Sequence, residues 1–342
     1  MSQPRKIFHV LDDLAMGGVT RALRNFDHPD LAAYGEHKTV DIRRETVRAQ
    51  TPNDIAIVHF TANWKKLAWL LELKLRGGFS RIILIEHTYT EGYEKNEVEP
   101  KKRFRAMLRL AYRMVDTVVA VSKHQREWIL EHALAPAAKV IAIPQSRICD
   151  DLLALPLMPA PKGPLKIRAF GRFHKQKGFD LLIEAMSRIP ANLAELKIAG
   201  TGPDEALLRQ HSDRLPHVEI CEPFTSPDAF LSDADLVAIP SRWEAFGLVG
   251  TEARAAGRPI LAARIDGLND QLDAASFGHS PNSVASIVRA IYRAASVTNF
   301  PARGKAVRTR AAAEYGAMIA NWCQLLSDSA ERQLHALRAT GS

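Results

Sequence analysis

The sequence predicts an α/β protein with two domains, each built on a doubly wound parallel sheet. Short apolar runs typical of buried strands alternate with helical stretches, and this alternation occurs twice along the chain. A proline-rich stretch, Leu155–Pro164, separates the two series and is typical of a connector. At 342 residues the chain is also longer than a single hydrophobic core usually supports.

The first series predicts five strands, two of which lead to a histidine. His87 directly follows one apolar run, so it lies at the carboxyl end of a strand, where open α/β sheets bind ligands. His59, after the run DIAIV, competes for the same role. The predicted strands are Lys6–Val10, Asp54–Phe60, Arg81–Glu86, Asp116–Val121 and Lys139–Ile143.

The turn after the first strand contains Gly17 and Gly18, ahead of a helix that begins near Val19. A dinucleotide-binding domain would carry Gly-x-Gly-x-x-Gly here, so the sequence disfavours a nicotinamide-dependent dehydrogenase. A glycine pair before a helix also forms ordinary turns, and the residues alone leave its role open.

The second series places basic residues in a strand-to-helix loop. Its predicted strands are Lys166–Phe170, Glu195–Ala199, His217–Cys221, Leu236–Ile239 and Pro259–Ala262. The first of them is followed by GRFHKQKG, which contains Arg172 and Lys177. A guanidinium and an ammonium there can neutralise a dianionic leaving group. The second strand runs into the glycine-rich turn AGTGPDEALL, which contains Gly202.

The strongest pattern is the stretch Ala234–Gly257, ADLVAIPSRWEAFGLVGTEARAAG. It predicts a strand, a loop and a helix that ends at Gly257. Glu244 then lies at the carboxyl end of the strand and Glu252 in the first turns of the helix. Both carboxylates therefore face the edge at which such sheets bind ligands.

The start of this helix is a candidate anion-binding element of the same site. Backbone N–H groups in the first turn of a helix have no partner within it, and the helix dipole favours an anion such as a diphosphate there. The groups concerned belong to Gly247, Leu248 and Val249.

These strings together resemble the signature of the retaining glycosyltransferases of family 4, which have the GT-B fold. The similarity rests on the two glutamates with Phe-Gly-Leu between them, on the Gly-Arg and Lys-Gly string, and on Gly-x-Gly-Pro. It is dense from Lys166 to Asp270 and thin across the first half. Asn269 and Asp270 stand where family members often carry Pro-Glu, which leaves the donor open.

The resemblance implies two Rossmann-like domains that face a central crevice. Residues 1–157 would form the N-terminal, acceptor-binding domain, and residues 158–312 the C-terminal domain that binds the nucleotide sugar. Residues 313–342 would form a terminal helix that crosses back to the N-terminal domain.

The family's motifs also imply roles for individual residues. Glu252 would bind the ribose of the nucleotide, Glu244 the hydroxyl groups of the transferred sugar, and His87 would help to place that sugar. The implied catalytic residues are Arg172, Lys177, Glu244 and His87. The implied donor-binding residues are Gly17, Gly18, Gly202, Ser241, Phe246, Gly247, Leu248, Val249 and Glu252.

The implied reaction is transfer of a hexosyl-type sugar from a nucleotide diphosphate sugar to a hydroxyl acceptor, with retention at the anomeric carbon. The acceptor would be a glycan or glycolipid, such as a lipid-linked glycan or polysaccharide precursor. Glu244 is engaged by ring hydroxyls in the family's pattern, so we expect front-side displacement rather than a covalent glycosyl-enzyme. The base (UDP, GDP or ADP) stays open. The alternatives are a non-hydrolysing nucleotide-sugar epimerase and a catalytically silent GT-B binding subunit.

We expect no metal, and no cofactor beyond the nucleotide-sugar substrate. Asp233 and Asp235 match an Asp-x-Asp metal motif, but they precede their strand and so lie at the amino end, away from the ligand-binding edge. The three cysteines, Cys149, Cys221 and Cys323, have no metal-ligand spacing and agree with a reducing compartment.

The net charge of +8 predicts attraction to an anionic partner. Within 101–114 a basic residue recurs every four positions, at Lys101, Arg105, Arg109 and Arg113, and 64–76 adds two tryptophans to further basic residues. Both segments suit docking on anionic lipid headgroups, and a solvated basic face is the open alternative. No nucleic acid is expected, because no recognised module accompanies the charge.

The sequence predicts a cytoplasmic protein, peripheral on the inner face of the cytoplasmic membrane if the basic segments dock. No apolar run approaches the roughly 20 residues that span a bilayer. The first residues lead into a strand and do not resemble a signal peptide.

Overall fold

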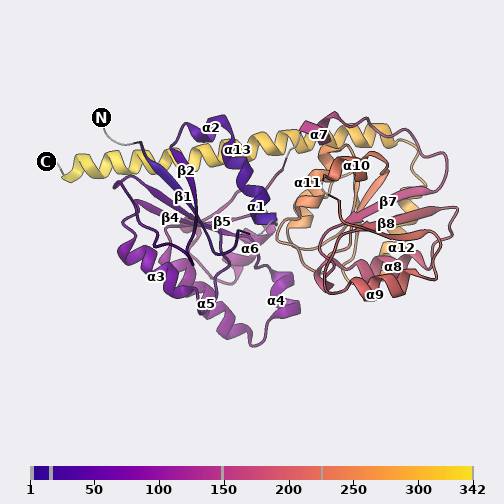
Figure 1. The fold of residues 1–342 in the computed structure, drawn as a ribbon, viewed down its shortest axis with the longest axis horizontal. Coiled ribbons are helices and arrows are strands. Elements are labelled where there is room, and N and C mark those ends of the chain that lie inside the picture. Colours follow the sequence, from indigo (N-terminus) through magenta and orange to yellow (C-terminus); the bar gives the residue numbers. More distant parts are fainter. Residues whose placement is uncertain (1–3, 15–17, 148–149, 225, 341–342) are drawn as a thin grey trace. The chain divides into compact units, whose positions relative to one another are not determined.

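The computed structural model describes residues 4–14, 18–147, 150–224 and 226–340. The chain divides into two compact units (Figure 1): unit 1 consists of Met1–Gln145 and Gly316–Ser342, and unit 2 of Ser146–Tyr315. Each unit contains a six-stranded sheet whose paired strands run parallel. The predicted α/β class with two doubly wound parallel sheets is confirmed.

The sheet of unit 1 has the strand order β2-β1-β3-β4-β5-β6. Its strands are β1 (Lys6–Leu11), β2 (Glu36–Asp41), β3 (Ile55–Val58), β4 (Arg81–Glu86), β5 (Thr117–Ala120) and β6 (Val140–Ala142). The five apolar runs of the first series all form strands, and β2 is an additional one. The apolar pattern missed β2 because its sequence, EHKTVD, is polar and lies at the sheet edge, with only its last two residues buried.

The two faces of this sheet are covered by different elements. One face contributes Phe8, Val58 and Leu84 to a core that includes side chains of α3 (Leu67–Arg76), α5 (Lys101–Met114) and α6 (Lys123–Glu131). The other face carries His9 and His59. It is covered by α1 (Gly18–Leu23), the 3-10 helix η1 (Arg24–Asp27) and the last part of α13 (Phe300–Thr340), which Figure 1 shows passing the strands on the side opposite α3 and α5. Shorter helices are α2 (Pro29–Ala32), α4 (Glu91–Glu97) and η2 (Ala137–Lys139).

The sheet of unit 2 has the order β12-β11-β10-β7-β8-β9. Its strands are β7 (Leu165–Phe170), β8 (Ala194–Ala199), β9 (Val218–Cys221), β10 (Leu236–Ile239), β11 (Ile260–Ala263) and β12 (Phe277–His279). One face packs on α8 (Phe179–Met186), α9 (Glu205–Ser212) and α12 (Val284–Ala295), and the other on α7 (Asp150–Ala154), α10 (Pro227–Ser232) and α11 (Leu248–Ala255). Two 3-10 helices, η3 (Lys175–Lys177) and η4 (Asp266–Gln271), follow β7 and β11.

Along the sequence, the first segment of unit 1 ends at Gln145 and unit 2 begins at Ser146. The connector belongs to unit 2 because two arginines of that unit bind its carbonyl groups. Arg258 Nη1 donates to Pro156 O at 2.9 Å, and Arg308 Nη2 donates to Leu155 O at 2.6 Å. The helix α13 is continuous and belongs to both units, with its residues from Gly316 onward assigned to unit 1. Among the described residues, no helix has the length and apolarity needed to cross a bilayer.

Candidate functional site

Two predicted catalytic residues of unit 2 form an ion pair at the carboxyl edge of its sheet. Lys177 lies in η3, in the loop after β7, and Glu244 in the loop after β10. The Lys177 Nζ atom is 2.5 Å from Glu244 Oε2, and Ser241 Oγ donates to the same oxygen at 3.3 Å. Both side chains of the ion pair remain partly exposed, so the pair can be reached from solvent.

The loops that carry this pair are bound tightly to each other. Arg242 N donates to Gln176 O at 2.7 Å, and the Arg242 guanidinium binds both carboxylate oxygens of Asp180 at 2.8 and 2.6 Å. Gly178 has a φ of 65°, and a Cβ there would lie only 2.3 Å from Pro240 O. Glycine is therefore required for the approach of the two loops.

Arg172, the third predicted catalytic residue of this unit, is exposed in the same loop as Lys177. Within the described residues, no group forms a hydrogen bond or ion pair with its side chain. Its guanidinium is therefore available to an anion, which is the property that its predicted role requires. Gly202, predicted to bind the donor, lies in the turn that follows β8.

The start of α11 presents backbone N–H groups, as the sequence predicted. Gly247 precedes the helix with a φ of 91°. Gln271 Nε2 donates to Phe246 O at 2.6 Å and to Gly247 O at 3.0 Å, which satisfies both carbonyls and fixes the turn. No described group accepts a hydrogen bond from the N–H of Leu248 or Val249, so both can bind an anion. Phe246 itself is buried, with 4% of its surface exposed.

Glu252 is buried in α11 and bound to a residue that the sequence did not point to. Its Oε1 accepts a short hydrogen bond from Arg147 Nη1, and its exposed fraction is 2%. Arg147 belongs to no motif and lies ahead of α7, so only the folded chain brings it to Glu252. Asp266 was also missed, although its Oδ2 accepts a hydrogen bond from Glu244 N at 3.1 Å and so holds the Glu244 loop.

Unit 1 places the two competing histidines in one hydrogen-bonded chain of four imidazoles. His37 Nδ1 lies 2.8 Å from His9 Nε2, and His9 Nδ1 lies 2.9 Å from His59 Nε2. His59 Nδ1 lies 3.3 Å from His87 Nε2, and His87 Nδ1 lies 2.9 Å from Gln145 Nε2. His59 is 4% exposed, whereas His87 is half-buried at the open end of β4, so His87 is the more accessible of the two.

The four hydrogen-bonded histidines cross the sheet of unit 1 diagonally. His37 is level with Ile7, so His9 lies two residues further along its strand. His9 is level with Ile57, so His59 again lies two residues further along. Because side chains two residues apart share a face, all these imidazoles lie on the same side of the sheet and advance toward its carboxyl edge.

Aromatic side chains cover the interior part of the histidine chain. The Phe26 ring lies 4.4 Å from the His9 ring, and Trp322 of α13 lies 4.9 Å behind Phe26, measured between ring centroids. Burial lowers the pKa of His9 to about 3 and that of His87 to about 4, and it holds the pKa of His59 well below its ordinary value. These imidazoles are therefore neutral at pH 7.

Buried Glu86 fixes the backbone that follows His87. Its Oε1 accepts hydrogen bonds from the N–H groups of Thr88 and Tyr89, both at 3.0 Å, and its Oε2 accepts one from Tyr112 Oη at 2.9 Å. Burial raises the pKa of this carboxyl group despite these donors.

The carboxylates of the Asp-x-Asp string have structural partners. Asp233 binds Lys166 Nζ at 2.5 Å and Arg168 Nη2 at 2.9 Å, and Asp235 accepts a hydrogen bond from Lys166 N at 2.9 Å. In the described parts of the chain, no group of three or more metal-ligating side chains is found.

Gly17 lies outside the described residues, and Gly18 is the first residue of α1.

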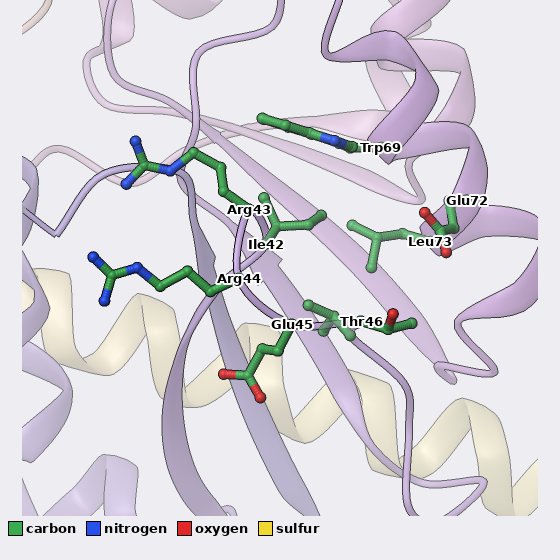
Figure 2. A pocket seen from close by; sticks show the side chains of 9 residues that line it. Ile42, Arg43, Arg44, Glu45, Thr46, Trp69, Glu72 and Leu73 are labelled. Atoms are coloured by element: carbon green, nitrogen blue, oxygen red, sulfur yellow. The ribbon is translucent and has the colours of Figure 1, made fainter.

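A surface pocket of about 210 Å³ in unit 1 lies beside α3 (Figure 2). It is lined by Ile42, Arg43, Arg44, Glu45, Thr46, Val47, Trp69, Glu72 and Leu73. Both arginines are paired with the single carboxylate of Asp41, at 3.0 and 3.3 Å, and Glu45 and Glu72 also line the pocket, so its positive charge is balanced. None of the predicted site residues lines it.

Two of the basic side chains predicted to form a stripe on α5 make hydrogen bonds within unit 1. Arg105 forms two hydrogen bonds to Glu94, at 2.6 and 2.7 Å, and Arg109 donates to the carbonyls of His132 and Ala133. Lys101, Lys102, Arg103 and Arg113 are exposed. Large apolar side chains are exposed on or beside the neighbouring helix surfaces: Trp64 (48%), Leu71 (45%), Leu75 (72%) and Leu110 (40%).

Sequence comparison identifies relatives of part of the chain. Residues 164–297 match the family described as glycosyl transferases group 1. The glycogen synthase of Mycobacterium tuberculosis is 30% identical over 196 residues, 52% of this chain and 44% of that protein. D-inositol 3-phosphate glycosyltransferase 1 of Catenulispora acidiphila is 33% identical over 144 residues, 35% of this chain and 34% of that protein. The chain thus covers less than half the length of these two relatives.

Solved structures match over nearly the whole chain. Sucrose-phosphate synthase from Thermosynechococcus elongatus has a TM-score of 0.73 at 20% identity, covering 97% of this chain and 100% of that one. HepE from Anabaena, solved in complex with UDP-glucose, has a TM-score of 0.70 at 16% identity, covering 96% and 99%. At such identities the likeness establishes the fold. Residues 164–297 of unit 2 therefore resemble the group 1 glycosyl transferases, and the chain has the GT-B fold of these solved structures.

Proposed function

We propose that this protein transfers a sugar from a nucleotide diphosphate sugar to a hydroxyl group of a glycan or glycolipid acceptor. The observation that carries the proposal is the edge of the unit 2 sheet. There an available guanidinium (Arg172), an ammonium paired with a carboxylate (Lys177 and Glu244) and two backbone N–H groups at the start of α11 follow two neighbouring strands, β7 and β10. The group 1 glycosyl transferase match covers the same loops.

The proposed division of roles follows the charges. Arg172 and Lys177 stabilise the diphosphate as the glycosidic bond breaks, because its negative charge grows in the transition state. Because Lys177 is paired with Glu244, their binding positions are adjacent: a phosphate oxygen can bind the Lys177 ammonium while a sugar hydroxyl donates to the Glu244 carboxylate. Glu252, buried and held by Arg147, is suited to accept hydrogen bonds from the two ribose hydroxyls.

We propose retention of configuration by front-side displacement, in which a donor phosphate oxygen accepts the proton of the acceptor hydroxyl. In this mechanism no carboxylate attacks the anomeric carbon and no metal is required. Glu244 is held by Lys177 and Ser241, which suits a hydrogen-bonding role better than that of a nucleophile. Trapping of a glycosyl adduct on Glu244, seen by mass spectrometry of the quenched enzyme, would refute this mechanism.

We further propose that the surface formed by α3 and α5 docks on anionic lipids at the cytoplasmic face of a membrane. Exposed leucines and a tryptophan lie there among lysines and arginines, which is the composition of an interfacial surface. The Arg103 guanidinium lies 5.7 Å from the Trp64 ring centroid, so charge and aromatic ring are adjacent.

The test of the function begins with thermal unfolding in UDP, GDP or ADP, each alone. A nucleotide that binds the native chain raises the Tm, and the nucleotide that does so identifies the base of the donor. The matching nucleotide sugars are then incubated with a lipid extract, and the products are analysed by mass spectrometry and by NMR of the anomeric proton. If no nucleotide changes the Tm and no product forms, the proposal is wrong. Epimerised donor in the absence of acceptor would indicate an epimerase instead.

A further inference from the structure

The four-histidine chain of unit 1 has a direction that its two ends determine. At one end, His37 Nε2 lies 3.3 Å from Leu31 O. A carbonyl oxygen can only accept, so His37 must donate from Nε2. A neutral imidazole carries one proton, so Nδ1 of His37 is then a bare acceptor.

The same step repeats along the chain. The bare Nδ1 of His37 requires a proton on Nε2 of His9, which leaves Nδ1 of His9 bare. That atom requires a proton on Nε2 of His59, and the bare Nδ1 of His59 requires one on Nε2 of His87. All four histidines are therefore Nε2–H tautomers, and His87 ends the chain with a bare Nδ1.

The other end of the chain agrees with this direction. His87 Nδ1 faces the side-chain nitrogen of Gln145 at 2.9 Å, and an amide NH₂ can only donate. The two ends are independent of each other, since one is a main-chain carbonyl before β2 and the other a side-chain amide after β6. A chain of neutral rings is required, because each ring must donate once and accept once, and burial keeps the rings neutral.

We propose that His37, His9 and His59 are positioning residues that fix the tautomer of His87, so that His87 offers its Nδ1 lone pair to a hydroxyl group of the bound sugar. This inference rests on the proposed transferase function. A sugar hydroxyl is the same kind of partner for Nδ1 as the Gln145 amide, so it can take the place of that amide without any change in the rest of the chain.

The direction of the chain also argues against a proton relay. If one proton moved along all four rings, Nε2 of His37 would lose its hydrogen and face Leu31 O lone pair to lone pair. Asp27 and Arg5 are the charged groups that act on His37, and their effects on its pKa oppose each other. The chain is therefore suited to hold a tautomer rather than to carry a proton.

The test uses the far end of the chain, where a substitution leaves His87 and its neighbours untouched. His37 is half-buried on the edge strand β2, so it tolerates replacement better than the interior rings. His37→Asn places an amide oxygen at the position of Nδ1 and keeps an acceptor for His9. His37→Leu has a similar volume and removes that acceptor, so the two variants form a matched pair.

The readout is the ¹⁵N NMR spectrum of the imidazole rings in full-length protein labelled on histidine, with His87 assigned from a His87→Gln sample. We expect His87 to be a single Nε2–H tautomer at neutral pH in the wild type and in His37→Asn. In His37→Leu the direction of the chain is no longer set from the Leu31 end, so the Gln145 amide can turn and present its oxygen to Nδ1 of His87, and we expect a mixture of both tautomers. A protonated Nδ1 on His87 in the wild type, or an unchanged single tautomer in His37→Leu, would overturn the inference.

Kinetics connect the tautomer to function. With the nucleotide sugar that the wild type turns over, His37→Leu should lower kcat/KM on the order of tenfold, about the cost of one neutral hydrogen bond. His37→Asn should restore most of it. Equal activity of His37→Leu and the wild type would refute a positioning role. If the wild type transfers no sugar at all, the proposed function fails, while the NMR result still decides whether the chain fixes the tautomer.

Discussion

The ammonium of Lys177 lies 2.5 Å from Oε2 of Glu244, so the loop after β7 and the loop after β10 neutralise each other's charge. Arg172, in the same loop as Lys177, is exposed and binds no described residue. Of these two basic side chains, Arg172 therefore has its whole charge available to a diphosphate. Lys177 would have to bind the diphosphate and Glu244 at the same time. This difference leads to the first prediction.

Replacing Arg172 by alanine should lower kcat for sugar transfer by about a hundredfold or more, the scale of losing one preorganised group that stabilises transition-state charge. Steady-state kinetics measure the effect. The matched control is Arg188→Ala, which removes an exposed guanidinium of the same unit that is paired with Glu184 on the surface, and it should change nothing. A rise in donor KM with normal kcat in Arg172→Ala would show that Arg172 serves only in binding.

Glu252→Ala should mainly raise the KM for the donor, because the proposed ribose contact forms before the chemical step. Arg147→Ala should do the same, since Arg147 holds the Glu252 carboxylate. The double variant should be little worse than either single one, because residues in one ion pair are not independent. Strictly additive effects of the two substitutions would contradict a shared role.

Gly178→Ala should destabilise unit 2 by about 1–3 kcal/mol, because the residue has a positive φ and its Cβ would meet Pro240 O. Urea unfolding followed by circular dichroism measures the change. Gly163→Ala is the control, since a Cβ there meets no atom within 4 Å. The idea that the two loops need this close approach is wrong if both variants are equally stable.

Unit 1 should lose stability as the pH falls from about 6.5. The pKa values of His9 and His87 are lowered in the folded chain, to about 3 and about 4, while an unfolded histidine titrates near 6.5. Stability is therefore complete above pH 6.5, and below it the unfolded state binds protons that the folded state does not. Each such imidazole contributes a slope of about 1.4 kcal/mol per pH unit in this window.

Hydrogen exchange of β1 and β4 between pH 7.5 and 5.5, corrected for the intrinsic rate, measures the net slope; the raised pKa of Glu86 contributes with the opposite sign, and it does so equally in the wild type and in the histidine variants. His87→Gln should make the slope shallower, whereas His211→Gln, which removes an exposed histidine of unit 2, should leave it unchanged. Protection that is independent of pH across the window would contradict the buried neutral chain.

Membrane docking predicts that the double substitution Leu71→Glu and Leu75→Glu abolishes co-sedimentation with vesicles of phosphatidylglycerol and phosphatidylcholine. The acidic side chains remove apolar contacts and repel the anionic lipid. Leu207→Glu on α9 is the control, because Leu207 has 46% of its surface exposed, close to the 45% of Leu71. Wild-type protein that stays in the supernatant would refute docking on such lipids.

The sequence predicted the sheets and the residues of the motifs, because both depend on local patterns. Strand-forming runs are apolar, and the loops of unit 2 carry Lys177 and Glu244 within recognisable strings. It did not predict the partners of these residues. Arg147 reaches Glu252 from outside any motif, and Asp266 binds the Glu244 loop from 22 residues away.

The histidine chain shows the same limit in unit 1. The sequence placed His59 and His87 after separate strands and offered them as alternatives. Their connection depends on the register between neighbouring parallel strands, which the period of each strand does not specify. His37 was not predicted to belong to this site at all, because β2 has the polar composition of an edge strand and was not predicted as a strand. The four histidines form one hydrogen-bonded chain only when the strands are paired in this register.

The continuous helix α13 has a consequence for synthesis on the ribosome. Domains at the start of a chain usually fold first, while the rest is still being made. Here Arg5 donates to Leu326 O, a partner 321 residues later, and Phe26 packs on Trp322. The nascent unit 1 therefore lacks its last core helix until translation has passed both units, and its aromatic and histidine-bearing face stays uncovered through most of elongation.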